Sequence, residues 1–194
     1  MTTPRKQQIV IAYDYSKHSQ AASDYAIANA CRTLDQVLHF VVALDPRTGV
    51  SALPPEGKVD FQYAERVQAH LADLLRTTFA SRQADKEVHY FVHARIGAPA
   101  EQILAVASDV SADSIIIGSH GRQGMERFLL GSVSERVVRE AKCPVTVVRD
   151  KTYAEVELLN VQAVPEHEHH YVPPRRFGYS RNQSVTRPPD WPLN

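Results

Sequence analysis

The sequence predicts an α/β protein in which helices cover both faces of a five-stranded parallel sheet. Short apolar runs alternate along the chain with longer segments of helical periodicity, and that order is typical of a parallel sheet with right-handed helical crossovers. The first apolar run, residues 8–12, carries little polarity on either side, as expected for a central strand buried on both faces. A change of composition near Asp150 limits the predicted folded domain to residues 1–150.

The five predicted strands are short runs rich in β-branched and aromatic residues, which favour strands. They comprise residues 8–12, 36–43, 88–93, 114–117 and 145–148. Residues 45–58 hold two glycines and three prolines and are predicted to form a loop.

Four helices are predicted between and after these strands. Ser16 is expected to cap the first, which ends near Cys31 and carries small residues on one face: Ala22, Ala26 and Ala30. The second runs from Asp60 to about Arg82, and its predicted core face consists of Phe61, Ala64, Val67, Leu71, Leu74 and Thr78. The third follows Pro99, a residue suited to a first helical position. The fourth is expected to begin at an N-cap formed by Ser132, with Glu135 completing an S-x-x-E capping box.

A glycine-rich stretch, residues 118–134, lies between the fourth strand and the fourth helix. Glycine lets the backbone bend freely and lets a ligand approach closely. The free N–H groups and the positive dipole end of the following helix favour an anion such as phosphate. The sequence therefore predicts a phosphate site here, with a plain glycine-rich turn and a capped helix as the alternative.

The first strand ends just before Asp14, and the fourth ends just before the glycine-rich stretch. In open parallel sheets, ligands bind beyond the carboxyl ends of the strands, where the strand order reverses. We therefore expect Asp14 and the glycine-rich stretch to form two walls of one crevice. Asp14 has an alternative role as a helix-capping residue.

The spacing of the glycines is more specific than their number. Gly118-x-x-Gly121, then nine residues, then Gly131-Ser132 resembles the nucleotide-binding signature of the universal stress protein family. The segments around it, residues 116–122, 130–137 and 143–148, resemble that family too. The resemblance covers about residues 7–149, and it implies a Rossmann-like, five-stranded domain similar to the adenine nucleotide α-hydrolase fold. Family members with this glycine pattern typically bind ATP.

The resemblance also implies roles for individual residues. Asp14 matches an acidic position on the ribose or adenine side, Val41 matches an apolar position against the base, and Ala12 and Tyr13 would line the adenine. Around the phosphates, the implied contacts are Gly118, Ser119, His120, Gly121, Arg122, Gly131, Ser132, Val133 and Ser134. Val41 as plain core, Arg122 as a surface arginine and His120 as a neutral loop histidine remain alternatives. One departure is Tyr15, which stands where the family commonly has glycine, and which we expect to narrow the mouth of the site.

The sequence holds no P-loop, no dinucleotide fingerprint after the first strand and no G-x-S-x-G nucleophile elbow. No catalytic residue is assigned, and we expect nucleotide binding with at most slow ATP hydrolysis. A bound triphosphate would bring Mg²⁺, held mainly by phosphate oxygens and water. The main hypothesis is a homodimeric, ATP-binding stress-response switch. A nucleotide-independent dimeric scaffold and a weak ATPase are the alternatives.

The last predicted strand, residues 145–148, is apolar and ends the folded domain. An unpaired edge strand is prone to association unless it is covered. Antiparallel pairing with its copy in a second subunit would cover it and give a twofold dimer, and the family resemblance points the same way.

Composition excludes several other classes of protein. The formal net charge is zero, so there is no electrostatic case for nucleic acid or an acidic membrane surface. No apolar run approaches the length of a membrane helix. The two cysteines, Cys31 and Cys143, lie far apart in the sequence, which favours a reducing cytoplasm over a disulfide-bonded secreted protein.

Residues 151–194 are predicted to form a C-terminal extension, either an arm docked on a folded surface or a partly disordered segment. They contain six of the chain's twelve prolines and too few apolar residues to fold alone. The aromatic residues Tyr171, Phe177, Tyr179 and Trp191 would anchor a docked arm. The run of residues 167–170, His-Glu-His-His, does not have the spacing of a closed zinc site, and no metal site is assigned.

Overall fold

The computed structural model describes residues 5–33, 35–47, 49–50, 52–81, 88–120 and 130–149. The predictions for the C-terminal extension lie outside these residues. In chain order the helices and strands are β1 (Gln7–Ala12), α1 (Lys17–Thr33), β2 (Gln36–Leu44), α2 (Phe61–Ser81), β3 (His89–Ile96), α3 (Pro99–Asp109), β4 (Ser114–Gly118), α4 (Ser132–Glu140) and β5 (Val145–Val148). Every predicted strand and helix is present, and its observed bounds lie within a few residues of the expected ones.

The strands form one sheet in the order β3-β2-β1-β4-β5, and every pair is parallel. The predicted fold class is confirmed. The chain first builds outward from β1 to β2 and β3, and then returns to the other side of β1 for β4 and β5. The strand order therefore reverses between β1 and β4, at the centre of the sheet.

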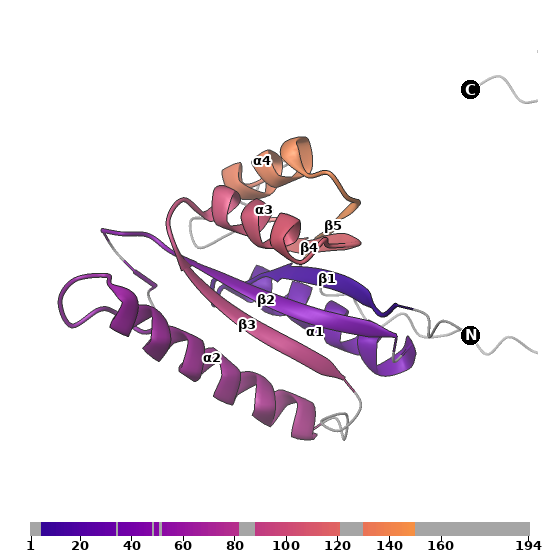
Figure 1. Cartoon of the computed structure of the whole chain (residues 1–194), viewed down its shortest axis with the longest axis horizontal. Helices are drawn as coiled ribbons and strands as arrows, with labels where there is room; N and C mark the ends of the chain where they lie inside the picture. The colour runs from indigo at the N-terminus through magenta and orange to yellow at the C-terminus, as the bar shows by residue number, and fades with distance from the viewer. Residues whose placement is uncertain are drawn as a thin grey trace, which may run out of the picture. The chain divides into compact units, whose positions relative to one another are not determined.

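Helices α1 and α2 cover one face of the sheet, and α3 and α4 cover the other (Figure 1). Alternate residues of β1 supply the two cores. Ile9 and Ile11 pack toward α1 and α2, whereas Val10 and Ala12 pack toward α3 and α4. This alternation is the ordinary consequence of the period-two side-chain geometry of a strand.

Helix α1 begins as expected. The backbone N–H of Ser19 donates a 3.2 Å hydrogen bond to the Oγ of Ser16, so the predicted capping role of Ser16 is confirmed. The predicted small-residue face is fully buried and consists of Ala22, Ala26 and Ala30. Small side chains let this helix lie close to the sheet.

The predicted core face of α2 is partly wrong. Phe61 and Leu74 are exposed, at 73% and 38% of their surface, and Thr78 is only partly buried. Leu75 and Phe79 are buried instead, and Phe79 stacks on Tyr90 of β3 with ring centroids 4.7 Å apart. After position 71, a helical stripe can continue through 74 and 78 or through 75 and 79, and packing on β3 selects the second.

A directional chain of hydrogen bonds crosses β1, β2 and β3. The side-chain amide of Gln8 donates to the carbonyl oxygen of Lys6 at 2.8 Å, which leaves its Oε1 to accept from His39 Nε2 at 2.9 Å. His39 Nδ1 must then accept from His93 Nε2, 3.1 Å away. The imidazole of His39 is therefore neutral in this arrangement, and burial lowers its pKa to about 4. Burial also lowers the pKa of His93.

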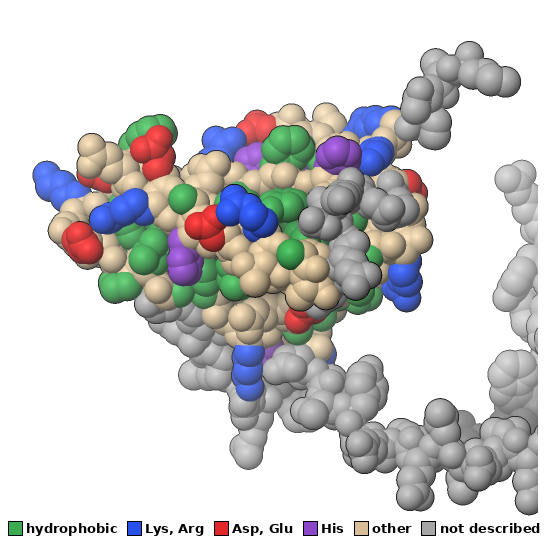
Figure 2. All heavy atoms as spheres, turned by 90° about the horizontal axis from the view of Figure 1, so that it is seen from below, with side chains coloured by type: hydrophobic (Ala, Val, Ile, Leu, Met, Phe, Trp, Pro, Cys, Tyr) green, Lys and Arg blue, Asp and Glu red, His purple; other side chains and the backbone are tan. Residues whose placement is uncertain are grey.

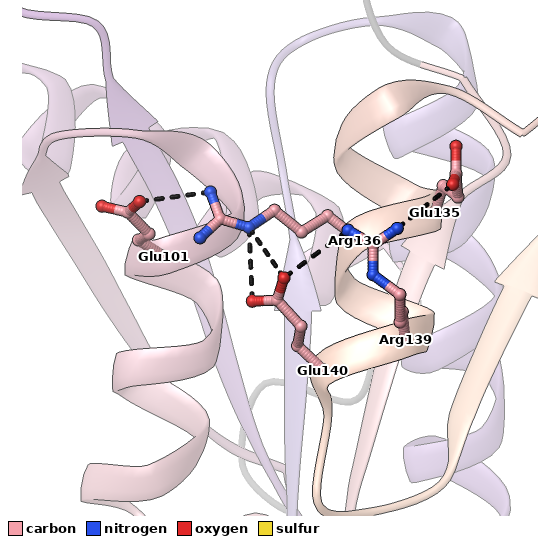
Figure 3. A network of polar contacts seen from close by, with 5 residues as sticks. All are labelled: Glu101, Glu135, Arg136, Arg139 and Glu140. Carbon is pink, nitrogen blue, oxygen red and sulfur yellow. Dashed lines mark hydrogen bonds and ion pairs between the residues drawn. The ribbon is translucent and has the colours of Figure 1, made fainter.

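Helix α4 is linked to α3 by ion pairs on the surface (Figure 3). The guanidinium group of Arg136 lies 3.1 Å from Glu101 of α3 and 3.1 Å from Glu140 of its own helix. The hydrogen bonds that Arg136 donates to Glu140 and Glu101 raise its pKa. Because these groups are exposed, the contacts orient the two helices more than they stabilise the fold.

Candidate functional site

Asp14 and the start of the glycine-rich stretch, the two predicted walls of a crevice, lie at the same edge of the sheet. Strands β1 and β4 are adjacent and parallel, with Ile11 opposite Ile116, so their carboxyl ends emerge side by side. Asp14 follows one end, and Ser119 and His120 follow the other. This edge is also where the strand order reverses, which is the position at which open α/β sheets bind ligands.

Gly118 is required by the close approach of α1. A Cβ added at Gly118 would lie 2.8 Å from both the carbonyl carbon and the carbonyl oxygen of His18. Backbone atoms cannot move aside as the end of a flexible side chain can. The first glycine of the signature therefore has a packing role that is independent of any ligand.

Three hydrogen bonds hold the neck of the glycine-rich stretch. The N–H of Ser119 donates to the carbonyl of Val148 at 2.8 Å, and the N–H of Gly131 donates to the carbonyl of Ser119 at 2.9 Å. The hydroxyl of Ser134 donates to the carbonyl of Gly118 at 2.8 Å. The first turn of α4 is thereby fastened to the end of β4. Gly121 and Arg122 lie outside the described residues.

The predicted capping box of α4 is wrong. Gly131 is the N-cap, with φ −60° and ψ 149°, and Ser132 is already the first helical residue. The hydrogen bond from Gly131 to Ser119 fixes Gly131 in an extended conformation directly before the helix, and this moves the start of the helix one residue earlier.

A glycine N-cap has consequences for the N–H groups of the first turn. The first N–H groups of a helix have no partner within the helix, and glycine has no side-chain oxygen to accept from them. The cap of α4 makes no side-chain hydrogen bond. The N–H groups of Ser132, Val133 and Ser134 therefore form a suitable site for an anion.

Ser134 and Ser132 differ in what their hydroxyls can contribute. Ser134 is 3% exposed and its hydroxyl proton is already donated to Gly118, so its remaining donor is the backbone N–H. The side chain of Ser132 is exposed. Nothing in the residue pattern distinguishes these two serines.

Asp14 organises the start of α1. Its Oδ1 accepts a 3.0 Å hydrogen bond from the N–H of Ser16, and its own N–H donates to Ser19 Oγ at 3.2 Å. Among the described residues, Asp14 Oδ2 accepts no hydrogen bond. Asp14 Oδ1 thus stabilises the start of α1, which is the capping role named above as the alternative for this residue. Asp14 Oδ2 remains available to a ligand.

Ala12 and Val41 lie directly opposite each other on β1 and β2. Both are buried in the core under α3 and α4. The side chain of Tyr13 is buried in the other core, under α1 and α2, on the opposite face of the sheet from Val41. Only the backbone of Tyr13 therefore remains to line a site next to Val41.

Tyr15 adopts a backbone conformation that normally favours glycine, with φ 65°. Its ring packs edge-on against Tyr13, with centroids 5.0 Å apart, and lies 5.8 Å from His70 of α2. The side chain therefore lies with the core under α1 and α2, on the opposite face of the sheet from Val41. Burial raises the pKa of its hydroxyl.

His120 contacts a residue that the sequence did not single out. Its ring centroid lies 5.5 Å from that of His18 in the first turn of α1. Its Nδ1 lies 3.2 Å from Ser119 Oγ, while its Nε2 is buried and has no hydrogen-bond partner among the described residues. No sequence spacing marks His18, because only the packing of α1 on the end of β4 brings it to this edge.

Other classes of site find no support in the described part of the chain. No group of three or more potential metal ligands occurs among those residues, and none of their helices is long and apolar enough to cross a membrane. On the face seen in Figure 2, basic and acidic side chains are intermixed rather than separated into a basic patch. Cys31 and Cys143 are both free thiols.

Comparison with known proteins gives a consistent family. Residues 6–149 match the model of the universal stress protein family. Universal stress protein MJ0531 of Methanocaldococcus jannaschii is 34% identical over 147 residues, which cover 74% of this chain and 82% of that protein.

Solved structures agree on the fold. The universal stress protein UspA from Lactobacillus plantarum superposes with a TM-score of 0.57 and 25% identity, over 76% of this chain and 100% of that one. A universal stress protein solved in complex with cAMP has a TM-score of 0.53 and 23% identity, over 75% of this chain and 98% of that one. The matched segment contains all five strands and both walls of the crevice. The chain belongs to the universal stress protein family.

Proposed function

We propose that this protein binds an adenine nucleotide, foremost ATP with Mg²⁺, in the crevice beyond β1 and β4. The observation that carries the proposal is the glycine-capped start of α4, whose first N–H groups have no hydrogen-bond partner among the described residues. This turn is bonded to the end of β4, the strand next to β1. The relative solved with cAMP supports the same ligand class, because cAMP combines an adenine, a ribose and a phosphate.

Each part of such a ligand has a suitable partner. The N–H groups of Ser132, Val133 and Ser134 would receive a phosphate. Asp14 Oδ2 would accept from ribose hydroxyls, and Ala12 and Val41 would form the apolar floor under the base. Ser119 would hold the neck of the site in place, while Gly121 and Arg122 stay predictions from the signature. Mg²⁺ would be bound mainly by phosphate oxygens and water.

The proposed biological role is a nucleotide-dependent switch in a stress response, acting as a homodimer in the cytoplasm. Dimerisation would use β5, which pairs with β4 alone among the described strands and so has one edge without a described partner. Any hydrolysis of ATP is expected to be slow, because the sequence lacks the P-loop lysine that assists phosphoryl transfer.

The test is to identify and measure the bound nucleotide. Acid-released ligand from the purified protein would be separated by ion exchange, and ATP, AMP, cAMP and GTP would be titrated calorimetrically. Adenine nucleotides are expected to bind and GTP to bind more weakly. A folded protein that neither carries nor binds an adenine nucleotide would overturn the proposal and favour the scaffold alternative.

The variant Gly131→Thr sharpens this test. The conformation of Gly131 suits any residue, and threonine is a good N-cap whose Oγ accepts from the same N–H groups that a phosphate would use. The variant should keep the stability of the wild type and lose at least about tenfold in affinity. Val138→Thr, on an exposed position of the same helix, is the matched control and should bind like the wild type.

A further inference from the structure

Two histidines from distant parts of the chain meet at the edge of the sheet where β1 and β4 end. His18 lies in the first turn of α1, and His120 follows β4. Their ring centroids are 5.5 Å apart, with 56° between the ring planes. The contact is set by the backbone, because the main chain of His18 packs directly against Gly118, two residues before His120.

One polar atom of this pair has no partner in the described part of the chain. His120 Nδ1 lies within hydrogen-bond distance of Ser119 Oγ, but its Nε2 is buried without a partner among the described residues. Buried polar groups in native proteins nearly always have a partner, and an exception calls for an explanation. A ligand group that reaches the pair would supply the missing hydrogen bond.

The surroundings favour an anionic ligand group. Both α1 and α4 begin at this edge, so the positive ends of two helix dipoles converge on it. The first turn of α1 contains no acidic residue that would offset its dipole. The nearest acidic residue in the sequence is Asp14, and one of its oxygens already accepts from Ser16.

We propose that His18 and His120 together contact the phosphate groups of the bound nucleotide, which makes His18 a further binding residue of this site. The inference rests on the proposed function and adds a residue to it that lies outside the glycine signature. Each imidazole can donate a hydrogen bond to a phosphate oxygen, and a phosphate-free nucleoside cannot use these donors.

The experiment compares ligands that differ only in phosphate. Adenosine, AMP and ATP would be titrated against the full-length wild type, His18→Phe and His120→Phe. Phenylalanine keeps an aromatic ring against its neighbour but removes the nitrogen donors, so packing is largely preserved. His89→Phe, at the amino end of β3 and therefore at the opposite edge of the sheet, is the matched control.

We expect each of the first two variants to lose about tenfold in affinity for AMP and ATP, with adenosine changed less than twofold. In the wild type, the imidazole Cε1–H signals of His18 and His120 should shift on addition of AMP more than on addition of adenosine. His18→Asn, which restores a donor, should recover part of the loss.

The outcomes separate the two proposals. Suppose that the wild type binds AMP. If His18→Phe binds AMP equally well, or if its affinity for adenosine falls as much as its affinity for AMP, the role of His18 is wrong and the proposed function stands. If His18→Phe is unstable, an unchanged His18 signal on addition of AMP decides against the inference. A wild type that binds no adenine nucleotide overturns both proposals.

Discussion

The Oγ of Ser134 donates a buried 2.8 Å hydrogen bond to the carbonyl oxygen of Gly118. This bond joins the first turn of α4 to the last residue of β4, across a sequence separation of 16 residues. It fixes the N–H groups of α4 relative to the central strands, and therefore relative to Asp14.

Replacing Ser134 by alanine should destabilise the protein by about 1–3 kcal/mol, because the buried carbonyl of Gly118 would lose its side-chain donor. Urea-induced unfolding measures this change. Ser132→Ala, at an exposed position in the same turn, should change the free energy of unfolding by less than about 0.5 kcal/mol. Equal effects of the two substitutions would show that the buried bond contributes nothing.

Gly118→Ala should destabilise the fold by about 2 kcal/mol or more, because the new Cβ would overlap the backbone of His18. Gly131→Ala, at the other end of the same stretch, should cost less than about 1 kcal/mol, since its conformation suits alanine and only N-cap preference is lost. Thermal or chemical unfolding of both variants tests this order. The reverse order would contradict the packing role of Gly118.

The pH dependence of stability should reflect the neutral imidazole of His39, which is hydrogen-bonded to His93. The pKa of His39 is about 4 in the folded protein and about 6.5 in a model peptide. Between these values the unfolded chain binds the extra proton, so the free energy of unfolding should fall as the pH falls from about 6.5 to 4. The slope from this residue is at most about 1.4 kcal/mol per pH unit.

The variant His39→Gln removes this titration and should flatten the dependence over the same pH range. Urea-induced unfolding of both proteins between pH 7.5 and 4.5 supplies the measurement. Parallel curves for the wild type and the variant would mean that His39 does not carry the effect.

Tyr15→Gly should be more stable than Tyr15→Ala by about 1 kcal/mol, although glycine usually destabilises relative to alanine. Both variants lose the packing on Tyr13 and His70, so their difference isolates the left-handed backbone at φ 65°. Differential scanning calorimetry of the pair measures it. An alanine variant at least as stable as the glycine variant would contradict the observed backbone conformation.

Val147→Pro should dissociate the proposed dimer. The carbonyls of Pro144 and Val148 accept from β4, so the alternate residues, Val145 and Val147, direct their backbone groups to the open edge. Proline at position 147 would remove an edge N–H and leave the pairing with β4 intact. Sedimentation velocity would report the change, and Val147→Ala, which keeps the N–H, should remain a dimer.

The strands, their parallel arrangement and the placement of Asp14 and Ser119 at the same edge of the sheet could be predicted from sequence. Each depends on a local pattern combined with a general rule of α/β topology. The burial of Leu75 rather than Leu74 could not, because both continue a helical stripe and only contact with β3 distinguishes them.

The detailed contacts of the site also could not be predicted from the sequence. Ser132 has the residue type of an N-cap, but the hydrogen bond between Gly131 and Ser119 decides where the helix starts. His18 carries no signal of its own, since its proximity to His120 depends on how closely α1 approaches Gly118. Long-range backbone contacts decided both cases.

The bond from Gly131 to Ser119 brings two positions twelve residues apart into contact and anchors both to the sheet. Insertions or deletions between them would change loop-closure entropy only slowly and would leave β4 and α4 in register. Substitutions between these two points can therefore alter ligand preference while the scaffold on either side stays unchanged.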